Sequence, residues 1–171
     1  MTAAGDYEGL GAARVIGSGP REEAHVFTCE QWVASGPEET FCFFSNVAHL
    51  EAITPPFLNF AILTPLPIEM RPGALIEYRL RLFGMPVGWL TRIEEWTPLR
   101  SFTDIQVRGP YARWVHRHRF APRDGGTQVS DHVEYRMPWS AVSGPVHALF
   151  VRPALERIFA YRRDVIARLL T

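Results

Sequence analysis

Two histidines and one aspartate are the residues of this sequence whose types and spacing suit chemistry. His116 and His118 alternate with arginines along residues 113–120, so strand geometry turns both imidazoles away from the arginine side. Asp131 falls on the inward side of residues 127–137, which alternate in the same way. A regular hairpin between the two segments places Asp131 across from His116 or His118. The sequence therefore predicts an inward His–Asp interaction.

Four roles are open to this inward patch, because buried charges must be paired, hydrated or bound to a ligand. It is a structural hydrogen-bond network, a polar floor that orients a bound ligand, or an acid–base pair for proton transfer. His116, His118 and Asp131 also form a three-ligand set for a metal ion. A partnered His–Asp pair explains them without a metal, so we expect no tightly bound transition metal and no cofactor.

Two further polar residues, Asp104 and Gln106, lie on the strand predicted before this pair. Phe102 favours an inward orientation for both, whereas Ile105 and Val107 favour the opposite one. Both are candidate ligand-binding residues whose direction the sequence leaves open.

Periodicity and turn signals predict the elements that position these residues. Residues 25–33 are rich in β-forming side chains and are followed by Ser35-Gly36-Pro37, where a helix begins with two glutamates in its first turn. A second short helix ends before Pro55-Pro56. From residue 57 the hydrophobic period changes to two and turn residues recur, which predicts a meander of antiparallel strands.

The C-terminal segment, residues 145–170, returns to a helical period, and Pro153 inside it predicts a kink or a short preceding helix. This helix is the only predicted element large enough to cover the dry face of the sheet. The predicted fold class is α+β: a curved antiparallel sheet wrapped around a long C-terminal helix, with two short helices after the first strand. We expect residues 1–24 to be a flexible leader and residues 25–171 to be one folded domain.

Composition argues against several classes of partner. At 171 residues, with 47% apolar and 21% charged residues, the chain suits one globular domain. Its 18 basic and 18 acidic residues cancel without long runs, so nucleic acid is not an expected partner. Cys29 and Cys42 lack metal-like spacing, and no apolar stretch is long enough to cross a membrane. We expect a cytoplasmic protein without membrane insertion.

Spaced motifs along these elements resemble one known superfamily. The motifs are Ile93-Glu94-Glu95-Trp96, Asp104-x-Gln106, Gly109-Pro110-Tyr111-x-x-Trp114-x-His116-x-His118-x-Phe120, Gly126-Thr127, Asp131-x-Val133-x-Tyr135-x-x-Pro138 and Ile158-Phe159-x-Tyr161-Arg162. Over residues 26–170 the chain resembles the START-like or SRPBCC superfamily, and these motifs resemble a bacterial branch of it. The pattern departs at residues 139–143, where a glycine is expected in the turn.

The resemblance implies the helix-grip fold, whose members include plant allergens, lipid carriers and polyketide cyclases. In this fold the sheet curves away from the long helix and leaves a cavity, expected at about 300–1,000 Å³. Aromatic side chains that would otherwise be plain core then line this cavity: Tyr78, Trp89, Trp114, Tyr135 and Phe159.

The expected function is to bind a small hydrophobic molecule, as a carrier or sensor, with these aromatic residues as walls. Its expected polar contacts are Asp104, Gln106, His116, His118 and Asp131. One alternative is a polyketide cyclase- or dehydratase-like enzyme that uses the His–Asp patch as general acid and base. Another is an interaction module with a filled core. The resemblance carries over no catalytic set residue by residue, so the sequence favours binding and does not decide whether a reaction is catalysed.

Overall fold

The computed structural model of the chain describes residues 24–138 and 146–170. The expected leader, apart from its last residue, and the departure at residues 139–143 lie outside the described residues. The elements follow the predicted order: a strand, short helices, a run of strands and a long C-terminal helix. The predicted α+β class is therefore confirmed.

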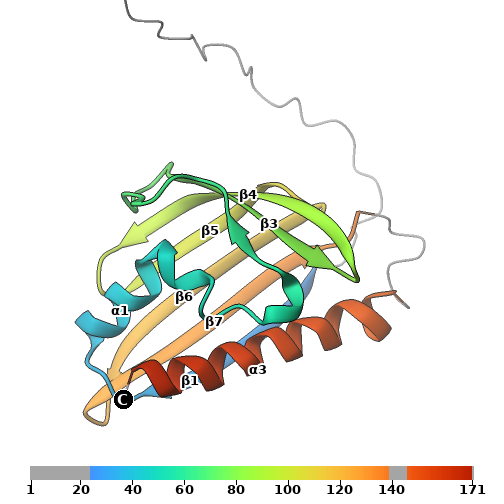
Figure 1. The fold of residues 1–171 in the computed structure, drawn as a ribbon. Coiled ribbons are helices and arrows are strands. Elements are labelled where there is room, and N and C mark those ends of the chain that lie inside the picture. Colours follow the sequence, from blue (N-terminus) through green and yellow to red (C-terminus); the bar gives the residue numbers. More distant parts are fainter. Residues whose placement is uncertain (1–23, 139–145, 171) are drawn as a thin grey trace, which may run out of the picture.

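One antiparallel sheet contains seven strands within the described residues. The strands are β1 (His25–Val33), β2 (Ala61–Ile62), β3 (Leu75–Leu82), β4 (Met85–Thr97), β5 (Ser101–Arg108), β6 (Arg113–Arg123) and β7 (Gly126–Arg136). Their order across the sheet is β1-β7-β6-β5-β4-β3-β2, so the chain meanders from β2 to β7 and β1 pairs with β7. Figure 1 shows that the sheet is strongly curved.

The strands β6 and β7 alternate between a buried and a more exposed face, as the sequence predicts. On β7, Val129, Asp131, Val133 and Tyr135 are buried, while Ser130, His132 and Glu134 between them are partly exposed. The period is less regular in β4 and β5, because their pairing shifts register between Leu90 and Thr91 and again between Ile93 and Glu95. Such shifts re-aim side chains at this part of the sheet.

Helical elements stand at both ends of the described chain. They are α1 (Pro37–Ser45), the short 3₁₀ turns η1 (Val47–Leu50) and η2 (Pro56–Leu58), the single π-helical turn η3 (His147–Val151) and α3 (Arg152–Leu169). Helix α1 begins at a proline, and the Asn46 side chain accepts a hydrogen bond from the Ala48 backbone N–H at the start of η1. Pro153 stands in the first turn of α3, directly after η3, so the chain has a short helical turn before the main helix.

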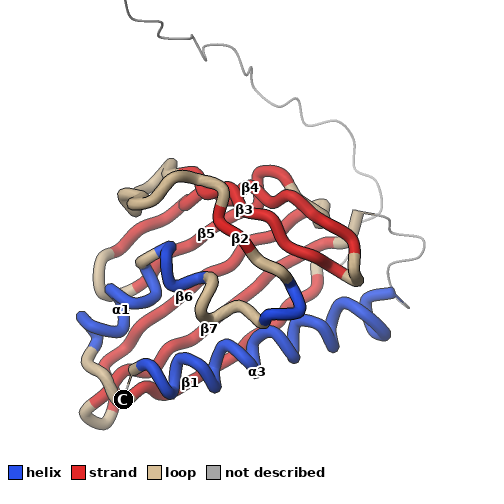
Figure 2. The backbone as a smooth tube through the Cα atoms, viewed as in Figure 1, coloured by secondary structure: helices blue, strands red, loops and turns tan. Residues whose placement is uncertain are grey.

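Helix α3 covers the concave face of the sheet, and α1 lies at the end where α3 finishes (Figures 1 and 2). Near that end, Ile166 of α3 belongs to the same buried cluster as Phe41 and Phe44 of α1. Towards its start, Leu155 and Phe159 pack with Val133 and Tyr135 of β7. Among the described residues, no helix has the length and apolar character needed to cross a membrane.

Candidate functional site

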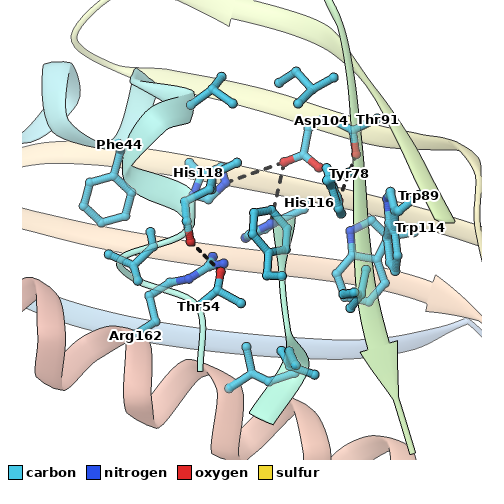
Figure 3. Close-up of a pocket in the computed structure, with 18 of the residues that line it drawn as sticks. Phe44, Thr54, Tyr78, Trp89, Thr91, Asp104, Trp114, His116, His118 and Arg162 are labelled. Atoms are coloured by element: carbon cyan, nitrogen blue, oxygen red, sulfur yellow. Dashed lines mark hydrogen bonds and ion pairs between the residues drawn. The ribbon is translucent and has the colours of Figure 1, made fainter. Parts of the chain in front are cut away.

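A pocket lies between the concave face of the sheet and α3, and its volume is about 170 Å³. Figure 3 shows residues of β3, β4, β5, β6 and α3 turned towards the same space. The volume is below the range expected from the sequence, because several aromatic rings occupy the space between the sheet and the helix. The pocket suits a compact ligand, since a cavity of roughly 150 Å³ is large enough to hold benzene.

One half of the pocket wall is a cluster of aromatic rings. Trp89 meets Trp114 edge-on, with 5.3 Å between ring centroids, and stacks beside Tyr78 at 5.9 Å. Tyr111 packs against Trp114 at 4.9 Å. The Tyr78 hydroxyl lies 3.2 Å from the Thr91 hydroxyl, and burial raises the pKa of Tyr78 well above its usual value. This end of the pocket is largely aromatic.

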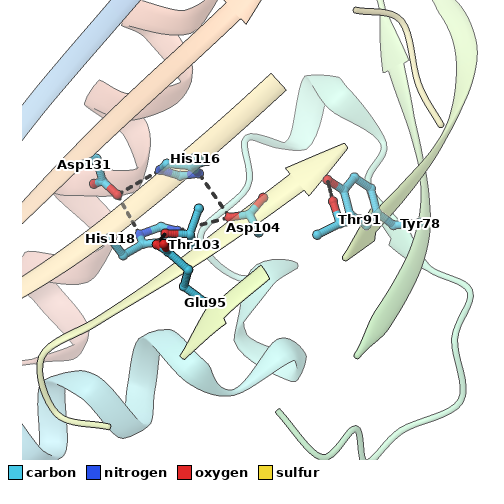
Figure 4. Close-up of polar contacts among 8 residues, drawn as sticks. All are labelled: Tyr78, Thr91, Glu95, Thr103, Asp104, His116, His118 and Asp131. Atoms are coloured by element: carbon cyan, nitrogen blue, oxygen red, sulfur yellow. Dashed lines mark hydrogen bonds and ion pairs between the residues drawn. The ribbon is translucent and has the colours of Figure 1, made fainter. Parts of the chain in front are cut away.

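At the other end of the pocket, four charged or titratable side chains from three adjacent strands come together (Figure 4). Cross-strand register brings them together: Asp104 of β5 lies opposite His116 of β6, and His118 of β6 lies opposite Asp131 of β7. His116 donates from Nε2 to Asp131 Oδ1 at 3.0 Å. His118 Nδ1 lies 2.7 Å from the same oxygen, but the direction does not make a hydrogen bond. The predicted His–Asp interaction is therefore present.

Asp104 completes this cluster from the opposite side. Its Oδ2 lies 3.6 Å from His116 Nδ1 and 3.6 Å from His118 Nε2, beyond hydrogen-bond distance in both cases. The two imidazole rings therefore stand between two carboxylates, each ring directing one nitrogen towards Asp104 and the other towards Asp131. We call these four residues the His–Asp cluster.

Burial and mutual charge set the protonation of the cluster. Burial lowers the pKa of His116, and the neighbouring His118 lowers it further. Burial also disfavours the charged form of His118, but Asp131 and Asp104 outweigh it and raise its pKa. For Asp131, burial favours the neutral form, yet His118 and His116 hold the pKa well below its usual range. The two histidines thus differ in basicity, and His118 retains a proton more firmly than His116.

Of the ten candidate residues, those that line this pocket are Tyr78, Trp89, Asp104, Trp114, His116, His118 and Phe159. Asp131 lies behind the two histidines and contacts them without lining the pocket. Tyr135 also lies outside the lining, and its hydroxyl lies 2.7 Å from His147 Nε2.

Gln106 is the candidate that the structure places furthest from its expected role. It does not line the main pocket but a shallow hollow that also contains Glu95 and Arg113. Its side-chain amide donates to the Tyr111 carbonyl at 2.7 Å and accepts from the Tyr111 N–H at 3.2 Å. Gln106 therefore braces the loop that carries Tyr111, which itself lines the main pocket. Gln106 pairs with Thr91 directly beside a register shift between β4 and β5, in the part of the sheet where alternation left its direction open.

Comparison with solved structures gives several matches over most of the chain. Protein TTHA0849 from Thermus thermophilus matches with a TM-score of 0.67 and 14% identity, over 86% of this chain and 100% of that one. The Zhui aromatase/cyclase from Streptomyces sp. R1128 matches with a TM-score of 0.67 and 16% identity, over 86% and 94%. Major latex-like protein 151 from Panax ginseng matches with a TM-score of 0.64 and 14% identity, over 86% and 97%.

The protein has the helix-grip fold. This confirms the fold expected from the sequence motifs, and at these identities the likeness establishes the fold alone. A scan against family models and a search of curated proteins find no match to this sequence.

This helix-grip protein also has a pocket residue that sequence reasoning passed over. Arg162 of α3 lines the pocket, and its guanidinium carbon lies 5.2 Å from the centre of the Phe159 ring. Its buried Nε has no hydrogen-bond partner in the described part of the chain. Helical spacing offered a signal, because Leu155 and Ile158, seven and four residues earlier, line the same pocket.

Proposed function

We propose that this helix-grip protein binds a small hydrophobic molecule in the pocket, as a carrier or sensor. The observation that carries this proposal is the pocket itself, with an aromatic cluster at one end and Asp104, His116 and His118 at the other. Apolar walls supply affinity, and a few placed polar groups select orientation. Small-molecule carriage is a use to which this scaffold lends itself, since the sheet and α3 enclose space between them.

Two hydrogen-bond donors without a partner indicate which groups the ligand carries. Trp89 Nε1 and Arg162 Nε are buried, line the pocket and have no hydrogen-bond partner among the described residues. A buried donor without a partner is costly, so an acceptor from a ligand or water satisfies it. The ligand we propose is therefore a compact, largely aromatic or alicyclic molecule that carries oxygen acceptors.

The test begins with native mass spectrometry of freshly purified protein, followed by denaturing extraction of any molecule that travels with it. In parallel, the ligand-free protein is titrated with 1-naphthylamine, and the fluorescence of the naphthylamine is the readout. We expect saturable binding, because the probe is apolar and about the size of the pocket. A folded protein without saturable binding at high probe concentration would contradict the proposal and favour the interaction module with a filled core.

A matched pair of variants on α3 locates the binding. Ile158→Phe adds bulk to a residue that lines the pocket, whereas Leu169→Phe adds bulk to an exposed residue of the same helix. We expect Ile158→Phe to weaken binding on the order of tenfold and Leu169→Phe to leave it unchanged, because only the first narrows the cavity. Equal effects would place the probe outside the pocket.

A second candidate function is catalysis of the cyclase or dehydratase kind. Its support is a matching structure described as an aromatase/cyclase, together with two adjacent histidines of opposite pKa shift facing the pocket. Such a pair suits proton transfer, with the more basic ring as acid and the less basic one as base. Recovery of an extracted ligand unchanged after prolonged incubation with the protein would favour the carrier; conversion to a new mass would favour the enzyme.

A further inference from the structure

Three atoms of the His–Asp cluster surround a common point. Asp104, His116 and His118 each offer one ligand atom, and these atoms lie within 4.8 Å of one another. Two of the separations, from Asp104 Oδ2 to the facing imidazole nitrogens, are 3.6 Å. Atoms spaced in this way share a centre no more than about 2.4 Å from each, close to the 2.0–2.2 Å of zinc with nitrogen and oxygen ligands.

These separations are poor for direct hydrogen bonds and suitable for a bridging cation. The 3.6 Å contacts leave Asp104 Oδ2 without a hydrogen bond from either ring. A tetrahedral ion with bonds of about 2.05 Å holds its ligand atoms about 3.3 Å apart. The two 3.6 Å separations exceed this spacing by about 0.3 Å.

The Asp131 carboxylate lies behind both imidazoles and holds the His116 ring as metal-bound histidines are held. His116 Nε2 donates to Asp131 Oδ1 at 3.0 Å, and His118 Nδ1 lies 2.7 Å from the same oxygen. Histidine ligands commonly give their second ring N–H to a carboxylate, which directs the free lone pair of the other nitrogen at the metal. In this arrangement the free lone pairs of His116 Nδ1 and His118 Nε2 lie on the side of Asp104.

The charges of the two carboxylates also favour a bound cation at this point. The side chains of Asp104 and Asp131 are 15% and 10% exposed, and within the described residues their ion pairs are those with His116 and His118. Histidines bind a metal as neutral imidazoles, so in the metal-bound state the two carboxylates would leave two negative charges in mostly apolar surroundings. A divalent ion neutralises them, which lowers the cost of burying both carboxylates.

We propose that Asp104, His116 and His118 bind one divalent first-row transition-metal ion, with Asp131 as a positioning residue. All three ligand residues line the pocket, so the remaining coordination position faces the ligand space. Three protein ligands and one open position make a metal available to an oxygen atom of a bound molecule. The proposed set differs from the one considered from the sequence, in which Asp131 was the third ligand, and it departs from the expectation that no metal is tightly bound.

The test uses the untagged full chain, freed of metal with a chelator and then dialysed. Co²⁺ is added while visible absorption and tryptophan emission are recorded, and Zn²⁺ is then added to displace it. We expect one Co²⁺ per chain, with the visible absorption of a low-coordinate site, and quenching of emission because Trp114 lies 6.4 Å from the His116 ring. Replacement of Trp114 by Phe should remove a large part of that quenching.

Substitutions separate ligands from the positioning residue. Asp104→Asn and His116→Gln should each weaken Co²⁺ affinity more than about 100-fold, whereas Asp131→Asn should weaken it on the order of 10- to 100-fold. His132→Gln is the matched control, because His132 pairs with Glu134 at 3.3 Å on an exposed part of β7 and should change nothing. Circular dichroism and denaturant midpoints establish that each variant is folded.

Several results would overturn the site. Folded wild-type protein without saturable Co²⁺ and Zn²⁺ binding excludes it, and so does Co²⁺ binding that Asp104→Asn leaves intact, since surface histidines then account for it. If His116→Gln does not fold, Asp104→Asn and the wild-type quenching decide the question. Binding of 1-naphthylamine to the metal-free protein tests the ligand pocket separately, so either proposal can fail while the other stands.

Discussion

The two faces of the β6–β7 hairpin carry the same kinds of His–carboxylate contact in opposite surroundings. On the concave face, His116 and His118 meet Asp131 with side chains that are 7–10% exposed. On the other face, His132 and Glu134 lie 3.3 Å apart and are 39% and 34% exposed. Neighbouring residues of one strand, Asp131 and His132, therefore enter contacts of similar chemistry and very different burial.

The difference shows that burial, and not the pairing alone, decides what such a contact does. Water solvates His132 and Glu134 whether or not they meet, so their contact contributes little to stability. The groups of the concave face have lost that solvation, and each depends on its neighbours for compensation. A polar cluster kept in such a place is a natural position for function, and each prediction below tests the contrast.

The largest expected effect is on stability, from Asp131→Ala in metal-free protein. This substitution leaves two buried imidazoles without their carboxylate and should cost about 3 kcal/mol of unfolding free energy. Glu134→Ala on the exposed face of the same strand should cost less than about 0.5 kcal/mol. Denaturant titrations at neutral pH measure the unfolding free energies of both variants. Similar losses of unfolding free energy would contradict the contrast between the two faces.

The next effect is on ligand binding, from substitutions on the two faces of β6. Trp114→Ala removes an aromatic wall of the pocket and should weaken 1-naphthylamine binding on the order of tenfold. Arg117→Ala changes a residue on the other face, whose guanidinium lies 3.9 Å from Glu95, and should leave the affinity within about twofold. A fluorescence titration distinguishes them. An affinity that falls equally in both variants would show that the probe does not occupy the pocket.

A smaller effect on stability distinguishes the two carboxylates of the concave face, Asp104 and Asp131. Asp104→Asn should change the unfolding free energy of metal-free protein by less than about 1 kcal/mol, because its contacts are 3.6 Å long and make no hydrogen bond. Asp131→Asn, which removes an accepting charge at 3.0 and 2.7 Å, should cost more. Denaturant midpoints of the two variants rank them, and the reverse order would assign the structural role to Asp104.

The smallest effect is a pH dependence at the start of the C-terminal helix. Burial lowers the pKa of His147, with further contributions from His25, which stacks on it at 3.6 Å, and from Arg152. A histidine whose pKa is lowered by folding takes up its proton more readily in the unfolded chain, so stability falls as pH drops below about 6.5.

His147→Gln should therefore reduce the loss of stability between about pH 7.5 and pH 5.5. The measurement is the difference in denaturant midpoint at the two pH values for wild type and variant. Because the His–Asp cluster is unchanged in His147→Gln, its own pH dependence cancels in the comparison. An identical pH dependence in both proteins would show that the His147 contact contributes nothing.

The local sequence pattern was sufficient to predict the helices and strands, and to predict which side chains of the regular strands point inward. The bounds of β1 were predicted as residues 25–33, because β-forming residues end there at Ser35-Gly36-Pro37. The inward direction of His116, His118 and Asp131 followed from the period of two, which holds along any strand that keeps its register. Pro153 predicted either a kink or a short preceding helix, and the structure has the second, since proline fits the first turn of a helix.

Alternation of polar and apolar residues was not sufficient to predict side-chain directions where the pairing of two strands shifts register. The pairing of β4 with β5 shifts twice, and this is where the sequence left Asp104 and Gln106 undecided. The structure turns Asp104 into the pocket and uses Gln106 to brace Tyr111. A register shift depends on the partner strand, so the pattern of one strand cannot reveal it.

What the sequence by itself determined is thus the order of elements, the α+β fold class and the inward side of β6 and β7, because short-range periods and turn residues encode all three. The sequence also predicted that Asp131 meets His116 or His118, but only the tertiary structure decided which other inward groups join them. It placed Asp131 behind the two histidines, Asp104 in front of them, and Arg162 of α3 on the pocket wall. The physical reason is that these contacts join elements far apart in sequence, whose separation depends on sheet curvature and on how α3 packs across it.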